Sequence, residues 1–192
     1  PLMRKDVIER ASQTKEIIFP IFTNGTMLDE EYMKIFDANR NLVPVLSIEG
    51  DQIRTDARRG KGTYELLINT MDCLNANGML YGASITITSE NLYTVTSKAF
   101  ISELYNRGCT VVFFVEYVPV DNSTKALAPT NKERDYLENE QSNLRKIYEH
   151  MIFISFPGDE KHSGGCLAAG RGFFHINTDG EIGRASCRER VF

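Results

Sequence analysis

Short apolar runs alternate along the chain with longer segments whose apolar residues recur at helical spacing. The apolar runs close near Phe22, Leu46, Thr88, Val118 and Phe156. Segments with helical periodicity lie before the first run and between the later ones. They cover 4–15, a segment from 29 onward, 63–78, 97–106 and 129–150. This alternation is typical of βαβ units, whose strands pair in parallel through right-handed crossovers. The sequence therefore predicts an α/β fold with a parallel sheet.

Two expectations about local structure follow from the same pattern. The helix from about Thr63 should carry its apolar stripe at 66, 67, 70, 71 and 74, and the polar residues 51–62 before it should form a long crossover. Cys73 and Cys109 should be small, buried, apolar residues, because a free cysteine commonly packs in this way.

The character of the chain changes after Phe156. Glycines surround Cys166, and Asp179-Gly180 is a tight-turn signal, which predicts a second, smaller module over 157–180 after a first domain over 1–156. Residues 181–192 are rich in arginine and have no periodicity, and they resemble the translation of a sequencing adapter, so we expect a non-native tail there. Because Pro1-Leu2 leads directly into a helix, we also expect a strand upstream of it.

Net charge, the length of the apolar runs and the cysteine spacing argue against several classes of protein. A net charge of −4 argues against a nucleic-acid or polybasic membrane surface. No apolar run approaches the roughly 20 residues that a membrane span needs. The four cysteines are irregularly scattered, which favours a reducing cytoplasm over a disulfide framework.

Polar residues follow the predicted strands at their carboxyl ends. Because the carboxyl ends of parallel strands meet at one edge of a barrel, these residues predict a ligand site there. For any single residue, capping of the next turn is the simpler explanation, but a shared edge favours a ligand site for the group. None of them is an identifiable catalytic acid or base. The residues are Thr23, Asn24, Ser47, Glu49, Thr88, Asn91, Glu116 and Asp121.

The polar segment 51–62 adds positively charged residues next to the strand end that carries Ser47. Arg58 or Arg59 there suits bidentate capture of a carboxylate, although a solvated loop explains the same residues equally well.

Four short motifs together resemble the radical S-adenosylmethionine (radical SAM) superfamily, in the subgroup with a C-terminal SPASM or Twitch extension. Pro1-Leu2 resembles the end of a Gly-Gly-Glu-Pro motif, and 22–26 (Phe-Thr-Asn-Gly-Thr) resembles the third-strand motif. Residues 47–50 (Ser-Ile-Glu-Gly) and 56–64 resemble the fourth-strand region, where the subgroup usually has aspartate in place of Glu49. The resemblance spans about 1–180 and rests on the order and spacing of the motifs.

This resemblance implies a partial (β/α)6 barrel, truncated at its N-terminus. It also implies an enzyme in which a 4Fe-4S cluster reductively cleaves S-adenosylmethionine to a 5′-deoxyadenosyl radical that abstracts a substrate hydrogen. A cytoplasmic peptide or protein maturase, reduced by a flavodoxin or ferredoxin, fits that implication. By position, Thr23, Asn24 and Ser47 would line the S-adenosylmethionine site, with Glu49 and Arg59 close by. Arg59 would point toward the methionine carboxylate, and Asn91 is a weaker candidate for the same site.

The resemblance also carries expectations about the clusters. The three-cysteine loop of the radical cluster would precede Pro1 and is absent from the sequence, so the parent protein is expected to be an enzyme and the fragment inactive. Cys166 resembles the first ligand of an auxiliary cluster in the extension; a lone free thiol in a glycine-rich loop is the alternative.

Two rival functions remain at this stage. One is a non-redox α/β module that binds a small anionic ligand at the same edge through Arg58 or Arg59. The other is an interaction domain whose working surface is the charged helix over 131–150.

Overall fold

The computed structural model describes residues 2–163, 175–176 and 181–183. Its main sheet has five strands. The strands are β1 (Phe19–Thr23), β2 (Leu42–Ser47), β3 (Gly82–Ile87), β4 (Val111–Glu116) and β5 (Ile152–Phe156). The helices are α1 (Lys5–Ser12), α2 (Glu30–Ala38), α3 (Gln52–Arg59), α4 (Thr63–Ala76), α5 (Leu92–Val95), α6 (Lys98–Asn106) and α7 (Asn131–Ile147), with 3-10 turns η1 (Asn122–Leu127) and η2 (Gly158–Ser163).

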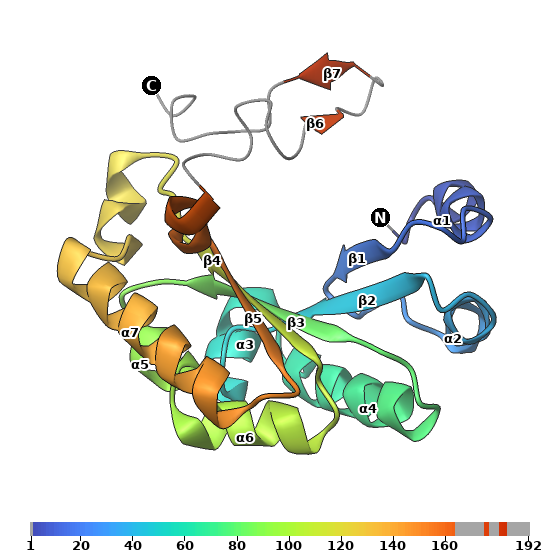
Figure 1. The fold of residues 1–192 in the computed structure, drawn as a ribbon, viewed down its shortest axis with the longest axis horizontal. Coiled ribbons are helices and arrows are strands. Elements are labelled where there is room, and N and C mark those ends of the chain that lie inside the picture. Colours follow the sequence, from blue (N-terminus) through green and yellow to red (C-terminus); the bar gives the residue numbers. More distant parts are fainter. Residues whose placement is uncertain (1, 164–174, 177–180, 184–192) are drawn as a thin grey trace.

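The strands lie in the order β1-β2-β3-β4-β5, and every neighbouring pair is parallel. The order never reverses, so successive right-handed crossovers place their helices on the same face of the sheet. Figure 1 shows the helices arranged around the outside of the sheet in this way. The predicted α/β fold is therefore confirmed, and its one-sided arrangement is that of a partial barrel rather than of a doubly wound sheet.

A contact between two aromatic rings shows that the sheet is strongly curved. Phe22 lies on β1 and Phe113 on β4, yet their ring centroids are 5.2 Å apart. On a flat sheet, three strand spacings would separate these positions by about 14 Å. The face opposite the helices is therefore concave, and the two rings meet across it.

The hydrophobic core lies between the sheet and the helices. Leu46, Ile85 and Phe114 are fully buried and belong to one buried cluster with Leu67 of α4 and Leu144 of α7. Most helix-facing positions on these strands are apolar, which is the usual way in which a parallel sheet covered by helices is stabilised.

The expectation of a polar crossover without helix over 51–62 is wrong, because residues 52–59 form helix α3. Asp51 caps its start by accepting a hydrogen bond from the amide of Arg54 at 2.9 Å, and Gly60, with φ of 104°, ends it. Only Thr55 of this helix is buried. The helix therefore has no apolar stripe, and periodicity could not reveal it.

The expectations for the cysteines and for the stripe of α4 are confirmed in part. Cys109 is buried, and burial raises the pKa of its thiol to about 12. Cys73 is exposed, so its assignment as a buried residue is wrong. In the same helix Leu66 is 38% exposed, because the helix turns it away from the sheet and presents Leu67 instead. Because an α-helix has 3.6 residues per turn, the adjacent positions 66 and 67 point in clearly different directions, and one of them can be exposed while the other is buried.

After β5 the chain enters η2, and a hydrogen-bonded node holds this turn. The Asp159 carboxylate accepts hydrogen bonds from the Ser155 amide at 2.7 Å and from Gln141 at 3.1 Å, and it pairs with Arg145 at 2.8 Å. Farther on, β6 (His175–Ile176) pairs antiparallel with β7 (Ile182–Gly183). The predicted cluster ligand Cys166 lies outside the described residues.

Candidate functional site

Register fixes which side chains line the concave face. Ser47 pairs with Ser84, and Ser84 pairs with Phe113, so these three residues point to the same side of the sheet. Since Phe113 meets Phe22 across the concave face, that side is the concave one. Thr86, two residues beyond Ser84 on β3, points the same way.

Three hydroxyl groups form a strip on this face, at Ser47, Ser84 and Thr86. All three residues are half-buried. None of these hydroxyls has a hydrogen-bond partner among the described residues, and none is among the buried unpaired atoms there, so solvent reaches each of them. We call these residues the hydroxyl strip. Its donors and acceptors remain available to a ligand.

The concave face is also uncharged. Alternation and register assign every described strand position on this side to an apolar residue, a glycine or a hydroxyl residue. The nearest carboxylate on β4, that of Glu116, lies on the helix side and pairs with Arg134 of α7. The concave positions are Pro20, Phe22, Val43, Val45, Ser47, Gly82, Ser84, Thr86, Val111, Phe113, Val115, Ile152, Ile154 and Phe156.

Glu49, just beyond β2, is the centre of a charged node at the rim. Its side chain is only 3% exposed, and its carboxylate pairs with Arg58 at 3.3 Å and with Arg59. Its backbone amide donates to the hydroxyl of Thr55 at 3.2 Å, and its backbone carbonyl accepts from the side-chain Nδ2 of Asn91 at 3.3 Å. Glu49 thus joins the end of β2 to α3 and to the turn after β3. Arg59 Nε is buried and has no partner among the described residues.

The other predicted site residues mainly shape turns. Thr23 is buried on the helix side, and its hydroxyl accepts a hydrogen bond from the Gly25 amide at 3.2 Å. Asn24 is exposed and accepts a hydrogen bond from the Thr26 amide at 3.3 Å. Asn91 accepts from the Thr88 amide at 2.8 Å and donates to the Thr86 carbonyl at 2.8 Å. The capping explanation therefore accounts for the contacts of these three side chains.

Asp56 has a capping role that explains part of the motif at 56–64. Its carboxylate accepts hydrogen bonds from the amides of Tyr64 at 2.9 Å and Gly62 at 3.0 Å, and these bonds hold its pKa below the usual range. Asp56 thereby satisfies the start of α4, where Gly62 offers no side chain for a cap. Similarly, Asp121 accepts from the Ser123 amide at 2.8 Å at the start of η1.

The structure thus joins Glu49, Arg58, Arg59 and Asn91 in one network and places Ser47 on the concave face beside it. It does not bring Thr23 to that face. The sequence reasoning missed Ser84, Thr86 and Phe113. A signal for the first two was available, because β3 alternates as Ala-Ser-Ile-Thr-Ile, and a strand packed on both faces would be apolar throughout.

The resemblance implies two cofactors, a 4Fe-4S cluster and S-adenosylmethionine, and the side chains of the described residues can be compared with the needs of each. No group of three metal-ligating side chains occurs among the described residues. The hydroxyl strip offers uncharged hydrogen-bond donors and acceptors, and Arg59 pairs with Glu49 just beyond the end of β2. In the described portion, no helix is both long and apolar enough to cross a membrane.

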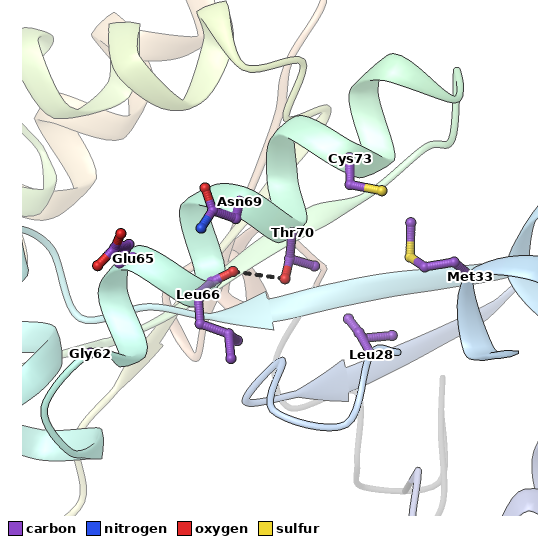
Figure 2. Close-up of a pocket in the computed structure, with 8 residues that line it drawn as sticks. All are labelled: Leu28, Met33, Gly62, Glu65, Leu66, Asn69, Thr70 and Cys73. Atoms are coloured by element: carbon purple, nitrogen blue, oxygen red, sulfur yellow. Dashed lines mark hydrogen bonds between the residues drawn. The ribbon is translucent and has the colours of Figure 1, made fainter. Parts of the chain in front are cut away.

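A separate hollow of about 460 Å³ lies outside the barrel, between α4 and the start of α2. Figure 2 shows Leu28 and Met33 on one side of it, and Leu66 and Cys73 of α4 on the other. None of the predicted site residues lines this hollow, so it is not the site to which the sequence motifs point.

No family model matches the sequence, and no curated protein matches it. Solved structures do share its fold. SuiB from Streptococcus suis, bound to S-adenosylmethionine, has a TM-score of 0.69 at 16% identity over 85% of this chain, and another structure holds SuiB with its precursor peptide SuiA. The chain spans only 41% of SuiB.

Two further structures extend this similarity. One is anSMEcpe with bound AdoMet and the Kp18Cys peptide, at a TM-score of 0.66 and 14% identity, covering 92% of this chain and 52% of that protein. The other is a domain of a pyruvate-formate lyase-activating enzyme from Bacteroides vulgatus, at 0.53 and 10%, covering 78% and 87%. At these sequence identities the comparison shows a shared fold, the parallel partial barrel. Two of the three proteins, SuiB and anSMEcpe, were solved with S-adenosylmethionine bound.

Proposed function

We propose that this chain is the core of a radical SAM enzyme that binds S-adenosylmethionine on the concave face. The observation that carries the proposal is an uncharged strip of three hydroxyl groups without a partner among the described residues, in a partial barrel that shares its fold with SuiB bound to S-adenosylmethionine. The motifs at 22–26, 47–50 and 56–64 support it independently, because they occur in the order expected for the superfamily.

Each part of the proposed site has a physical role. The hydroxyls of Ser47 and Ser84 would bind sugar or base atoms of the cofactor, since both are positioned by strand pairing and neither has a competing partner among the described residues. Phe22 and Phe113, whose rings meet edge to face on the concave side, would shield the bound cofactor from water. Glu49 pairs with Arg59 at the rim, and the Arg59 guanidinium would meet the methionine carboxylate there.

The remaining parts of the machinery would lie elsewhere in the parent protein. A 4Fe-4S cluster, when bound, supplies the electron that cleaves S-adenosylmethionine reductively. We place its cysteine loop upstream of Pro1 and regard Cys166 as a ligand of an auxiliary cluster in the module over 157–180. The isolated chain would then be inactive. A peptide or protein substrate is the proposal for the parent, supported by the peptides bound in SuiB and anSMEcpe.

The test begins with the complete reading frame that contains this chain. The full protein is reconstituted anaerobically with iron and sulfide, mixed with S-adenosylmethionine and dithionite, and assayed for 5′-deoxyadenosine by chromatography. We expect steady formation of 5′-deoxyadenosine. Ser47→Ala should lower the rate about tenfold, because it removes a hydrogen bond to the bound cofactor.

Ser142→Ala is the matched control, because Ser142 lies on the exposed side of α7, where its hydroxyl bonds only to the Glu138 carbonyl at 2.9 Å. This variant should turn over like the wild type. If the reconstituted protein shows the spectrum of a reduced cluster but forms no 5′-deoxyadenosine, the proposed function is wrong.

A further inference from the structure

We propose that the hollow between α4 and the start of α2 binds a linear aliphatic amine, with its ammonium group at Glu65 and its carbon chain along α4. The hollow lies outside the barrel and shares no residue with the concave face, so this inference goes beyond the proposed function and does not rest on it. Its volume of about 460 Å³ lies in the range of about 300–1,000 Å³ that is usual for small-molecule sites.

The two walls of the hollow are each fixed by their own buried residues. Helix α2 buries Tyr32 and Phe36 in the core, and α4 buries Leu67 and Met71. The turn that leads from β1 toward α2 also packs against α4, since a Cβ atom on Gly25 would lie 2.8 Å from Leu67 Cδ2. A residue without a side chain is therefore needed at position 25 for this close contact. Together these contacts hold both walls of the hollow in place.

The lining between the two walls is largely apolar. Leu66, Thr70 and Cys73 follow one another along one side of α4 for about two turns of helix, and Figure 2 shows Leu28 and Met33 opposite them. Leu66 is 38% exposed there, and Met33 is half-buried. A ligand that covers these side chains removes apolar surface from water, which favours a hydrocarbon chain.

The charge of the lining selects a cation. No described residue that lines the hollow is charged except Glu65, and its carboxylate has no ion pair or hydrogen bond within the described part of the chain. Asn69, about one turn farther along α4, adds a side-chain carbonyl acceptor. The Thr70 hydroxyl donates its proton to the Leu66 carbonyl at 2.8 Å, so it presents an acceptor to the hollow. A hydrogen-bond donor with a single positive charge matches these three groups.

The length of the hollow distinguishes a free amine from the lysine side chain of a partner protein. Residues 65 and 73 of α4 are about 12 Å apart along the helix axis. A lysine stem has four carbons and would end well short of Cys73, whereas an eight-carbon chain covers most of this length. The hollow therefore fits a free aliphatic amine better than a lysine side chain.

The experiment titrates octylamine, protonated at pH 7, into the isotope-labelled 192-residue chain and follows backbone amide shifts by NMR. We expect the largest shifts in α4 and at the start of α2, with a dissociation constant of about 1 mM, which is reasonable for a ligand of this size. Octanol should bind about threefold and octanoate at least about fivefold more weakly, because neither brings a positive charge to Glu65. Nα-acetyl-lysine amide should bind about tenfold more weakly, because its shorter stem covers less apolar surface.

Charge reversal at one position is the sharpest test of the assignment. Glu65→Lys should invert the preference, so that octanoate binds at least about threefold more tightly than octylamine. Glu149→Lys, at an exposed position after α7, makes the same change in net charge and should keep the preference of the wild type. Leu66→Asn should weaken octylamine binding about fivefold, because apolar contact is lost. Glu65 and Leu66 are both exposed, so these variants are expected to fold, and their amide spectra check that they do.

The inference is overturned if octylamine causes no localised shifts, if octanoate, octanol or the lysine amide binds as tightly as octylamine, or if Glu65→Lys leaves the preference unchanged. Shifts on β2 and β3 in place of α4 would also overturn it, because they would locate the amine inside the barrel. None of these outcomes bears on the formation of 5′-deoxyadenosine by the full protein, so the amine site and the proposed function can fail separately.

Discussion

The two faces of the sheet are made by alternating residues of the same strands and differ in almost every property. On β4, Phe114 points to the helices and is completely buried, while its neighbour Phe113 points to the concave face and is only half-buried. On β3, Ile85 is fully buried and Ser84 beside it has no hydrogen-bond partner among the described residues. The helix side holds the fold together, and the concave side leaves groups available for a ligand.

Polar groups also occur on the helix side of the sheet, but their surroundings differ from those on the concave face. Ser155 of β5 and Gln141 of α7 are both buried there, but the Asp159 carboxylate bonds to the Ser155 amide and to the Gln141 side chain. Glu49 at the rim is similarly paired with Arg58 and Arg59. The Ser155 amide, the Gln141 side chain and the Glu49 carboxylate are thus paired within the chain, whereas the hydroxyls of the strip have no partner among the described residues.

The largest effect expected from this comparison concerns the two phenylalanines of β4. Phe114→Ala should lower the free energy of unfolding by about 3–5 kcal/mol, because it opens a cavity in the core. Phe113→Ala should cost only about 1–2 kcal/mol, since a partly exposed edge contact is lost. Urea unfolding followed by circular dichroism measures both, and equal losses would mean that the two faces do not differ as described.

An intermediate effect is expected at the charged node of the rim. Glu49→Ala leaves the partly buried Arg59 without its partner and should lower the free energy of unfolding by about 2–4 kcal/mol. Glu65→Ala, on the exposed surface of α4, is the control and should have little effect. A loss for Glu49→Ala no greater than that of the control would show that the node contributes nothing to stability.

The smallest effect, and one that depends on pH, is expected at Asp159. Burial alone would raise the pKa of its carboxyl, but the Ser155 amide and Arg145 outweigh burial and lower it. A carboxyl with a lowered folded-state pKa stabilises the protein above its unfolded pKa of about 3.9, and this contribution is lost as the pH falls through the folded value. Asp159→Asn should therefore cost about 1 kcal/mol at pH 7 and progressively less below pH 4.

The measurement for Asp159 is a series of urea unfolding curves between pH 7 and pH 3. Asp135→Asn, at an exposed position on α7, provides the matched control and should follow the wild type throughout. A difference between Asp159→Asn and wild type that stays constant across this range would contradict the assigned contacts.

Much of the architecture could be predicted because hydrophobic periodicity reports burial directly. The runs ending near Phe22, Leu46 and Phe156 correspond to strands, and the helix expected over 129–150 is α7. Helix α3 escaped prediction because just one of its residues is buried, so periodicity carried no signal for it. The exposure of Cys73 was mispredicted because its place on α4 depends on the rotation of that helix against the sheet.

The candidate site was predictable only in part. Ser47 and Glu49 could be identified because they follow an apolar strand, but their roles depend on neighbours distant in the sequence: Ser84 across the sheet, and Arg58 and Arg59 of α3. Thr23 has the same position in its strand pattern as Ser47 has in its own, yet it points to the helices. Side-chain direction alternates with every residue, so the exact strand register had to be known.

The sequence by itself determined the strand–helix alternation, the parallel sheet and the carboxyl edge at which polar residues gather, because burial and turn formation are local properties of the chain. The tertiary structure alone decided the curvature that brings Phe22 against Phe113, the pairing that places Ser47 beside Ser84, and the burial of Glu49 between two arginines. Each of these contacts joins segments that only folding brings together, and local periodicity cannot encode a distance between such segments.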